Sequence, residues 1–503
     1  MRTVGGSTEK VVVVGAGLAG LSAAMHLAGR GRIVTVVERG THPGGRVGRC
    51  DVNGYRIDTG PTVLTMPDIL DAAFDAVGES LSSRMELRPV EPAYRAAFAD
   101  GSRIDVHSSP DAMAAEIERL TDRRQADGYL ELRRWLSRLY QVEFDGFINA
   151  NFDSPLSLVT PQLARVIALG GFRRWDTVVN RFITDERLKR LFTFQALYVG
   201  VPPQRALAVY AIIAYMDTVS GVHFPTGGVR ALPNAMAAAA ADAGVQFHYG
   251  ATVSNLERSG DRVRAVVTDT GERFDADAVV LTTELPDTYR LLGRTPRRPM
   301  RLRPAPSAVV AHVGCRAVTE QQAGHHNILF GAAWQQTFTD IIDDGRVMSD
   351  PSLLVTRPTA SDPTLAPSGR DLLYVLAPAP NTAVGAIDWA ATRADYVQHM
   401  LDTVRERLPG VGDDHELLHV VDPADWERQG MAAGTPFALA HTFSQTGPFR
   451  PANTVRGIDN VVLAGSSTIP GVGVPTAVIS GRLAADRVTG IPLLDKRTRA
   501  VVT

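Results

Sequence analysis

The fold is decided by residues 11–27, which read VVVVGAGLAGLSAAMHL. The first four residues are β-branched and end at a glycine, which is typical of a buried parallel strand. Gly15 permits a tight turn, Gly17 lets the backbone approach a pyrophosphate, and Gly20 lets the next helix pack close to the strand. The predicted helix, residues 18–27, offers free N–H groups and the positive end of its dipole to phosphates.

A second β-branched run, Ile33 to Val37, ends in Glu38. This acid lies about 20 residues after the glycines, where a carboxylate accepts hydrogen bonds from ribose hydroxyls. We include Glu38 and the adjacent Arg39 among the predicted cofactor contacts. Strand, glycines, helix, strand and acid together predict a dinucleotide site, although a plain βαβ unit without ligand has the same pattern. At this point the dinucleotide is either NAD or FAD.

Two later segments favour FAD. In Pro43-Gly44-Gly45-Arg46, the paired glycines let the chain cross a pyrophosphate and Arg46 can pair with it. The second segment, Asp58-Thr59-Gly60-Pro61, resembles the flavin-side loop of the amine-oxidase-like FAD superfamily. The alternative for Asp58 is a turn-forming residue without a ligand.

Composition excludes several classes of protein. The chain has 503 residues, 45% of them apolar, and a net charge of -2, which gives no reason to expect a nucleic-acid partner. Its two cysteines, Cys50 and Cys315, cannot form a disulfide framework or a four-cysteine zinc site and suggest a reducing compartment. The adjacent pair His325-His326 is a poor metal site, because neighbouring side chains point apart. We expect no metal, no signal peptide and no membrane-spanning helix.

The rest of the chain alternates between helical and strand-rich regions. We predict a helix from Ser109-Pro110, a mostly helical region over 128–220, and strands at 245–249, 263–268 and 278–282. Over residues 300–380, the sequence predicts short strands among Pro-rich loops. A helix from about Asp395 to Leu408, a strand over 460–464 and a helix over 475–488 follow.

This alternation predicts discontinuous domains in an α/β protein. A Rossmann-like FAD-binding domain would comprise residues 1–85, 225–295 and 430–503. An interleaved substrate domain, largely helical with a mixed sheet and associated with the membrane, would comprise residues 86–224 and 296–429.

Several segments resemble the bacterial carotenoid desaturases of phytoene-desaturase type, within the amine-oxidase-like FAD superfamily. They are DTGPTVLTMP at 58–67, FTFQALYVG at 192–200, HFPTGGVRALP at 223–233, ALAHTFSQTGPFRP at 438–451 and GVGVP at 471–475. The resemblance extends over residues 10–490. Ser466 follows Gly465 where more distant amine oxidases often carry an acid, and this agrees with the carotenoid branch.

The resemblance implies FAD-dependent removal of hydrogen from saturated bonds that flank a polyene, as in the desaturation of phytoene towards lycopene. It also completes the set of predicted cofactor contacts, which comprises Gly15, Gly17, Gly20, Glu38, Arg39, Gly44, Gly45, Arg46, Asp58, Thr59, Gly60, Val253, Gly465, Gly473, Val474 and Pro475.

The catalytic residues are not evident from the sequence. Such a substrate has no acidic proton, and a flavin accepts hydride directly, so we hypothesise that no strong acid–base residue is required. His441 and Asp217 are weak candidates for a catalytic or flavin contact, and His223 also precedes the Gly-Gly turn. Structural hydrogen bonding, capping and turn formation are the alternatives for these three residues.

A carotenoid precursor resides in lipid, and passage through water would cost about 0.8 kcal/mol per CH₂. We therefore expect peripheral docking on the inner face of the cell membrane by an otherwise cytoplasmic protein. The candidate segment is Pro161 to Ile183, where Leu163, Phe172 and Trp175 accompany Arg165, Arg173 and Arg174. The alternative is a core-packed helix with an exposed Arg face.

Other functions remain open on this scaffold. A carotenoid 3,4-desaturase, a ketolase and an isomerase are the nearest, and a flavin-free lipid or prenyl escort is the non-enzymatic one. An amine oxidase would need an aromatic cage, and no such pair stands out. The number of desaturation steps, the isomer formed, the electron acceptor and the oligomeric state do not follow from the sequence.

Overall fold

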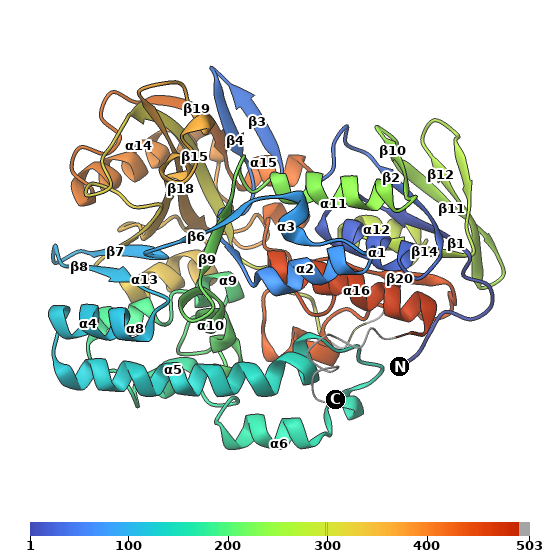
Figure 1. The fold of residues 1–503 in the computed structure, drawn as a ribbon, viewed down its shortest axis with the longest axis horizontal. Helices are drawn as coiled ribbons and strands as arrows, with labels where there is room; N and C mark the ends of the chain where they lie inside the picture. Colours follow the sequence, from blue (N-terminus) through green and yellow to red (C-terminus); the bar gives the residue numbers. More distant parts are fainter. Residues whose placement is uncertain (297, 299, 492–503) are drawn as a thin grey trace.

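The computed structural model describes residues 1–296, 298 and 300–491. Two sheet-centred parts lie side by side, and a layer of helices runs along one edge of the molecule (Figure 1). Segments far apart in sequence build each part. None of the described helices is both long and apolar enough to cross a membrane.

The first part is built on a five-stranded parallel sheet of order β10-β2-β1-β14-β20. Its strands are β10 (Gln246–Tyr249), β2 (Ile33–Glu38), β1 (Lys10–Val14), β14 (Ala278–Leu281) and β20 (Val461–Leu463). The strands predicted in these regions are confirmed within one or two residues. Both faces of β1 are buried, as its unbroken apolar run predicts, because a parallel sheet is covered on both sides.

Helices cover one face of this sheet. They are α1 (Leu18–Ala28), α2 (Pro67–Asp75), α11 (Ala231–Asp242) and α16 (Val474–Thr489). α1 and α16 cross closely, since a Cβ on Gly481 would lie 2.2 Å from the carbonyl oxygen of Ala19. Val11 and Val13 of β1 join the core beneath these helices. The predicted helices at 18–27 and 475–488 are confirmed.

A three-stranded antiparallel sheet covers the opposite face. It consists of β11 (Val253–Ser259), β12 (Arg262–Thr268) and β13 (Arg273–Asp275). Val12 and Val14 pack here against Val253, Leu256 and Val266. The sequence analysis missed β11 and β13, because exposed polar residues interrupt their apolar pattern.

The second part is built on a seven-stranded sheet of order β19-β15-β18-β17-β16-β7-β8. Its strands are β19 (Glu416–Val421), β15 (Ser307–Arg316), β18 (Arg370–Ala379), β17 (Leu353–Thr356), β16 (His326–Phe330), β7 (Tyr94–Phe98) and β8 (Arg103–Val106). All pairings are antiparallel except that of β16 with β7. The prediction of only short strands over 300–380 is wrong, because β15 and β18 span 10 residues each and pair along their whole length.

The helix α14 (Trp389–Arg407) covers one face of this sheet with Trp389, Met400 and Val404. The predicted start near Asp395 is wrong. The helix begins six residues earlier, because the Asp388 carboxylate caps it by accepting from the N–H groups of Ala390 and Ala391.

The layer of helices comes mainly from residues 110–218, as predicted. Its elements are α4 (Pro110–Leu120), α5 (Arg123–Glu143), η1 (Phe144–Ile148), η2 (Pro155–Leu158), α6 (Pro161–Ala168), α7 (Trp175–Val179), α8 (Glu186–Leu191), α9 (Ala196–Val199), η3 (Ala208–Ala211) and α10 (Ile212–Thr218). Ser109 caps α4 and accepts from the N–H of Ala112, which confirms the predicted start. α5 continues into η1, a single π-helical stretch of the kind often found beside functional sites.

The candidate membrane segment is not one amphipathic helix. α6 ends at Ala168, Gly170 and Gly171 turn the chain, and α7 starts at Trp175. Trp175 is wholly buried, so its predicted place on the docking face is wrong. The turn directs α7 inwards while α6 stays at the surface, where Ile167 is exposed.

Two small sheets join the parts. One has the order β5-β9-β6, from β5 (Leu64–Thr65), β9 (Val222–Pro225) and β6 (Leu87–Val90). The other is the hairpin of β3 (Arg49–Val52) and β4 (Tyr55–Asp58). The remaining helical elements are α3 (Leu81–Arg84), α12 (Leu285–Leu291), α13 (Trp334–Phe338), η4 (Thr339–Asp344), η5 (Pro358–Ala360), η6 (Pro363–Leu365), α15 (Pro423–Arg428), η7 (Ala432–Gly434), η8 (Phe443–Gln445) and η9 (Gly447–Phe449).

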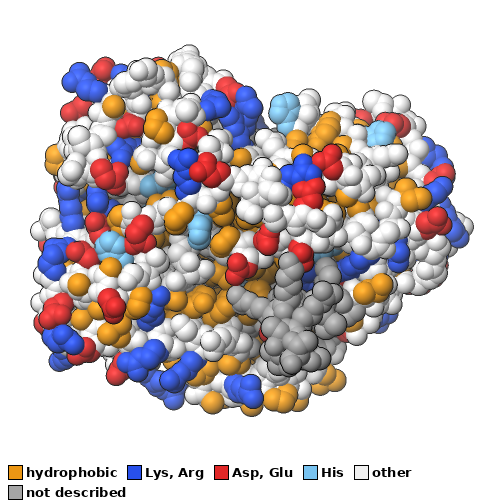
Figure 2. All heavy atoms as spheres, viewed as in Figure 1, with side chains coloured by type: hydrophobic (Ala, Val, Ile, Leu, Met, Phe, Trp, Pro, Cys, Tyr) orange, Lys and Arg blue, Asp and Glu red, His pale blue; other side chains and the backbone are white. Residues whose placement is uncertain are grey.

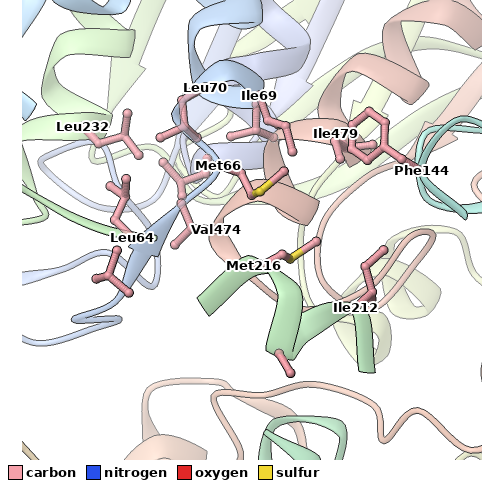
Figure 3. Close-up of a cluster of buried hydrophobic side chains, with 14 of the residues drawn as sticks. Leu64, Met66, Ile69, Leu70, Phe144, Ile212, Met216, Leu232, Val474 and Ile479 are labelled. Carbon is pink, nitrogen blue, oxygen red and sulfur yellow. The ribbon is translucent and has the colours of Figure 1, made fainter. Parts of the chain in front are cut away.

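The main hydrophobic core continues from the first part into the helices. Figure 3 shows Met216 and Ile212 of α10 near Met66, Val474 and Phe144. These side chains come from four separate segments of the chain. The core therefore fixes α10 beside the start of α16.

Candidate functional site: a dinucleotide cradle opening into an apolar cavity

The turn between β1 and α1 has the geometry that its glycines predict. Gly15 has a φ of +105°, and a Cβ there would lie 2.3 Å from Thr282 Oγ1. A Cβ on Gly20 would lie 1.9 Å from the carbonyl oxygen of Gly15, so only glycine lets α1 pack so close. Gly17 precedes α1 and supplies no side-chain cap, which leaves the first N–H groups of the helix open to a ligand.

Glu38 lies at the end of β2, almost fully buried, beside this turn. Its Oε2 accepts from the N–H of Ala16 and its Oε1 from the N–H of Gly40, both at 2.7 Å. Each carboxylate oxygen keeps a second lone pair for a hydroxyl group. Arg39 follows and donates to the carbonyl oxygen of Gln429 at 3.0 Å.

The Gly44-Gly45 segment crosses over the turn. Gly44 bridges to Gly17, and its N–H donates to the carbonyl oxygen of Ala16 at 2.9 Å. A Cβ on Gly45, whose φ is +58°, would lie 3.2 Å from the Cα of Gly17. Arg46 forms an ion pair with Glu284 beside the glycines. The backbone here is packed as closely as glycine allows.

Asp58 connects its loop to the segment just before α11 and does not line the cavity itself. It accepts from the N–H of Val229 at 2.6 Å and of Arg230 at 3.3 Å, just before α11. Burial raises the pKa of Asp58 to about 6, although these two N–H groups oppose the shift. Thr59 and Gly60 line the cavity described below, whereas neither Asp58 nor Gly20 is among its lining residues.

The last predicted segments reach the cavity from the other side. Gly465 follows β20, and its N–H donates to Ser480 Oγ at 3.0 Å. Gly473, Val474 and Pro475 form the start of α16, where Gly473 again provides no side-chain cap. Val253 of β11 also lines the cavity, as do Gly465, Gly473, Val474 and Pro475.

One cavity of about 1430 Å³ unites these groups. Ligand pockets commonly measure about 300–1,000 Å³, so this one holds more than a single small ligand. Of the predicted contacts, fourteen line it: Gly15, Gly17, Glu38, Arg39, Gly44, Gly45, Arg46, Thr59, Gly60, Val253, Gly465, Gly473, Val474 and Pro475. Two uncapped helix starts line this part of the cavity beside closely packed glycines, and they fit the phosphates of FAD.

The cavity continues away from the glycines between apolar walls. We call this region the apolar half. Its walls include Phe147, Ile148, Phe152, Leu158, Leu163, Val166, Phe172, Leu207, Val209, Ile212, Ile213, Met216, Phe443 and Phe449. Most belong to the layer of helices, and no local motif marks them in the sequence.

The two weak catalytic candidates both line the cavity. His441 faces Tyr210 with ring centroids 5.8 Å apart, and burial, followed by nearby Arg450, holds its pKa well below the usual range. Arg450 is itself buried and donates to the carbonyl oxygens of Ser466 and Thr468. His441 is therefore neutral at physiological pH. Asp217 lies on α10. His223 of β9 is not a lining residue.

Two lining residues were missed. Glu143, the last residue of α5, is buried, and its Oε1 has no hydrogen-bond partner among the described residues. Burial raises the pKa of Glu143 well above its usual range, which makes it a neutral acid. Tyr210 bonds Thr446 Oγ1 at 2.6 Å. Neither had a signal in the sequence, because their roles depend on helices that meet only in the fold.

The pair His325-His326 has structural partners. His325 Nδ1 bonds Ser361 Oγ at 2.7 Å, and His326 Nδ1 bonds Thr356 Oγ1 at 3.0 Å. Burial holds the pKa of His325 at about 3. Both rings are therefore neutral parts of the core.

Comparison with known proteins agrees with this geometry. The family model described as flavin-containing amine oxidoreductase matches residues 18–489. The chain belongs to this family. It is 60% identical over 493 residues to a protein named phytoene dehydrogenase from Streptomyces griseus, covering 97% of both chains. It is 36% identical to a zeta-carotene-forming phytoene desaturase from Myxococcus xanthus, covering 95% of this chain and 93% of the relative. The resemblance to carotenoid desaturases is thus confirmed.

Solved structures share the fold at low identity. An oxidoreductase from Methanosarcina mazei has a TM-score of 0.61 at 17% identity, covering 94% of this chain and 98% of its own. Putrescine oxidase bound to putrescine has a TM-score of 0.61 at 16% identity, covering 95% and 98%. The protein is therefore an FAD-dependent oxidoreductase with a Rossmann-like domain and an interleaved second domain of helices and mixed sheet. The exact domain boundaries stay a prediction.

Proposed function

We propose that this enzyme introduces double bonds into phytoene, a linear polyene precursor, during carotenoid biosynthesis. The observation that supports this proposal most strongly is one cavity of about 1430 Å³ that is lined both by the dinucleotide cradle and by the apolar half. Similarity at 60% identity to a protein named phytoene dehydrogenase supports the substrate class.

The residues divide the work between the two ends of the cavity. FAD, when bound, would supply the two-electron oxidant for a C–H bond. Glu38 would hold a ribose hydroxyl, the open N–H groups of α1 and α16 would hold phosphates, and Arg46 would balance their charge. The apolar half aligns the chain of the substrate and excludes water, so that orientation supplies much of the catalysis.

Expression in a host that accumulates colourless phytoene tests the function. The expected result is coloured pigment whose absorption bands and chromatogram report how many double bonds were added. Unchanged phytoene, with a soluble and flavin-loaded protein in the same cells, would contradict the proposal.

A second candidate is a later carotenoid as substrate. The chain is also 32% identical to an all-trans-zeta-carotene desaturase from Myxococcus xanthus, covering 97% of this chain and 95% of the relative. The lower identity makes it the weaker candidate. The same host supplied with zeta-carotene would distinguish the two, since conversion of zeta-carotene alone would favour the later step.

We also propose that the enzyme docks peripherally on the inner face of the cell membrane. The docking face comprises Leu156, Val159, Ile167, Phe172 and Phe443, which are 79%, 78%, 57%, 41% and 58% exposed. Figure 2 shows hydrophobic side chains along the lower edge of the molecule, in the region of α6, with Lys and Arg nearby. Exposed Arg165, Arg173 and Arg174 adjoin this face, an arrangement that favours anionic lipid headgroups.

The docking face lies at one end of the apolar half. Phe172 and Phe443 belong both to the face and to the cavity wall, and their rings lie 6.3 Å apart. A substrate could therefore pass from lipid into the cavity without crossing water, which would cost about 0.8 kcal/mol per CH₂.

Sedimentation with anionic liposomes tests the docking face. The double variant Ile167→Ser/Phe172→Ser should lose most of its vesicle binding. The matched control, Val384→Ser/Leu417→Ser, changes two residues that are 45% and 51% exposed elsewhere and should bind like the unmodified protein. Equal binding by both double variants would contradict this face.

A further inference from the structure

The apolar half contains a carboxyl group that no role yet described uses. Asp217 lies near the end of α10, next to Met216, and lines the cavity. Its side chain is 5% exposed, and Oδ2 has no hydrogen-bond partner among the described residues. No ion pair of Asp217 occurs there either. A buried carboxyl without such partners costs stability, so its presence on a substrate wall calls for a function.

Polar groups from two other regions, β7 and the start of α9, lie near this carboxyl. Tyr94 of β7 and Gln195, which precedes α9, lie beside it and favour its ionised form, while burial favours the neutral form more strongly. The result raises the pKa of Asp217 to about 7. The hydroxyl of Tyr198 on α9 lies close enough to interact electrostatically with Asp217.

The remaining charged and titratable groups near α10 are more remote. His326 stands behind Tyr94, with ring centroids 5.6 Å apart, and is neutral because burial lowers its pKa. From α5, the Arg133 guanidinium donates to the carbonyl oxygen of Thr218 at 3.3 Å. No cation is placed to hold Asp217 permanently ionised among the described residues, so its charge state is free to change.

A second carboxyl, that of Glu143, also lines the apolar half, and it differs from Asp217 in its charge state. Burial raises the pKa of Glu143 well above its usual range and keeps this carboxyl neutral. A neutral acid cannot accept a proton. Asp217, with Tyr94 and Gln195 beside it, is ionised in a substantial fraction of molecules near neutral pH and can accept one.

We propose that Asp217 Oδ2 accepts the proton released when the CH–CH unit of the substrate becomes a double bond. This inference rests on the proposed function. One carbon loses hydride, whose two electrons reduce FAD. The adjacent carbon loses a proton, and its C–H bonding pair becomes the new π bond. The proton forms an O–H bond at Asp217 Oδ2, in a part of the cavity whose walls are mostly apolar side chains. This proposal names a specific proton acceptor where the sequence analysis expected no strong acid–base residue to be required.

The isosteric variant Asp217→Asn tests the proposal on purified, flavin-loaded enzyme with phytoene in lipid vesicles. Turnover at saturating substrate should fall by about 100-fold or more, the usual contribution of a positioned base. The flavin absorbance per protein should not change. The control Asp145→Asn alters an exposed carboxyl outside the cavity and should keep full turnover.

The unmodified enzyme provides a second readout that needs no variant. Its turnover should rise with pH and level off above about pH 7, because only the carboxylate accepts the proton. Asp217→Glu should keep this rise with a shifted midpoint, and Asp217→Asn should lose it. A flat profile between about pH 5.5 and 8.5, or Asp217→Asn turnover above about one third of normal, would overturn the assignment. Failure of the unmodified enzyme to convert phytoene would instead overturn the proposed function.

Discussion

The two halves of the cavity are built in opposite ways. The nucleotide half is made of backbone, with glycines at fixed spacing on short segments that follow β1, β2 and β20. The apolar half is made of side chains from helices that are distant in sequence, and among the described residues Asp217 and Glu143 bring carboxyl groups to it. In the first half an added Cβ would lie 2.3 Å from its nearest atom at Gly15 and Gly44 and 3.2 Å from it at Gly45, whereas the second half is lined by apolar side chains of varied size. A dinucleotide has a fixed shape and charge and needs a closely fitting site built from backbone. A flexible hydrocarbon can be held by apolar side chains of varied shape.

The largest effect should come from adding one methyl group to the nucleotide half. In Gly45→Ala the new Cβ would lie 3.2 Å from the Cα of Gly17 at a positive φ. FAD affinity should fall by about 100-fold or more, because backbone on both sides cannot move apart freely. Flavin absorbance per protein and FAD titration measure it.

Gly78→Ala is the matched control for this variant. Gly78 has a φ of +80° with nothing within 4 Å of its Cβ position, so it shares the backbone strain but not the close contact. It should retain FAD. If both variants bound FAD equally well, close packing of the glycines would not explain the cradle.

The next largest effect should be on the free energy of unfolding, through the buried carboxyl of Asp217 in the apolar half. Burial raises the pKa of Asp217 from 3.8 to about 7. Between these values the unfolded chain releases its proton and the folded chain retains it, so stability falls as pH rises from about 4 to 7. Asp217→Asn lacks this loss and should be more stable than the unmodified protein by about 2–4 kcal/mol at pH 8, with little difference near pH 4.

Thermal unfolding at several pH values measures that difference. A constant gap between the two proteins, or a gap that grows towards acid, would show that the carboxyl is not neutralised by burial. The measurement needs no substrate and is independent of the proposed reaction.

A smaller effect should follow from Glu38→Gln. An amide nitrogen would replace one carboxylate oxygen that accepts from Ala16 or Gly40. FAD affinity should fall by about 10-fold, equivalent to about 1.4 kcal/mol. Titration of the flavin-free protein tests this, and an unchanged affinity would remove Glu38 from the predicted contacts.

The smallest effect should come from a volume-conserving change in the apolar half. Met216→Leu should retain FAD fully and lose less than about 1.5 kcal/mol of stability, as similar hydrophobic swaps do. Turnover should stay within a few fold of normal. A loss of FAD affinity as large as that expected for Gly45→Ala would contradict the distinction between the two halves.

Much of the nucleotide half could be predicted from sequence. Residues 11–20 and Gly44-Gly45 act through backbone geometry and Glu38 through its carboxylate, and all of them lie on one βαβ unit and the segment after it, where the spacing can be read from the sequence. The exception is Asp58, whose carboxylate turned out to bind the N–H groups of Val229 and Arg230. Those partners lie some 170 residues away, and no local pattern reveals them.

The apolar half was much less predictable. Hydrophobic periodicity identified the helices of residues 128–220 but not which faces would meet. Trp175 and Phe172 looked equivalent in the sequence, yet the Gly170-Gly171 turn buries one and exposes the other. The ten-residue strands β15 and β18 were also missed, since their burial on both faces removes the alternation that marks a strand.

The sequence by itself determined the βαβ start, the dinucleotide type, the family and hence the class of reaction. These depend on glycine spacing and on short segments that must fit FAD wherever they occur. Only the tertiary structure decided that Asp217 and Glu143 share one cavity, that Tyr94 and Gln195 accompany only the former, and that Phe172 and Phe443 meet at its end. The physical reason is that burial and the local electrostatic environment depend on which distant elements pack together, and that arrangement sets the charge of each carboxyl.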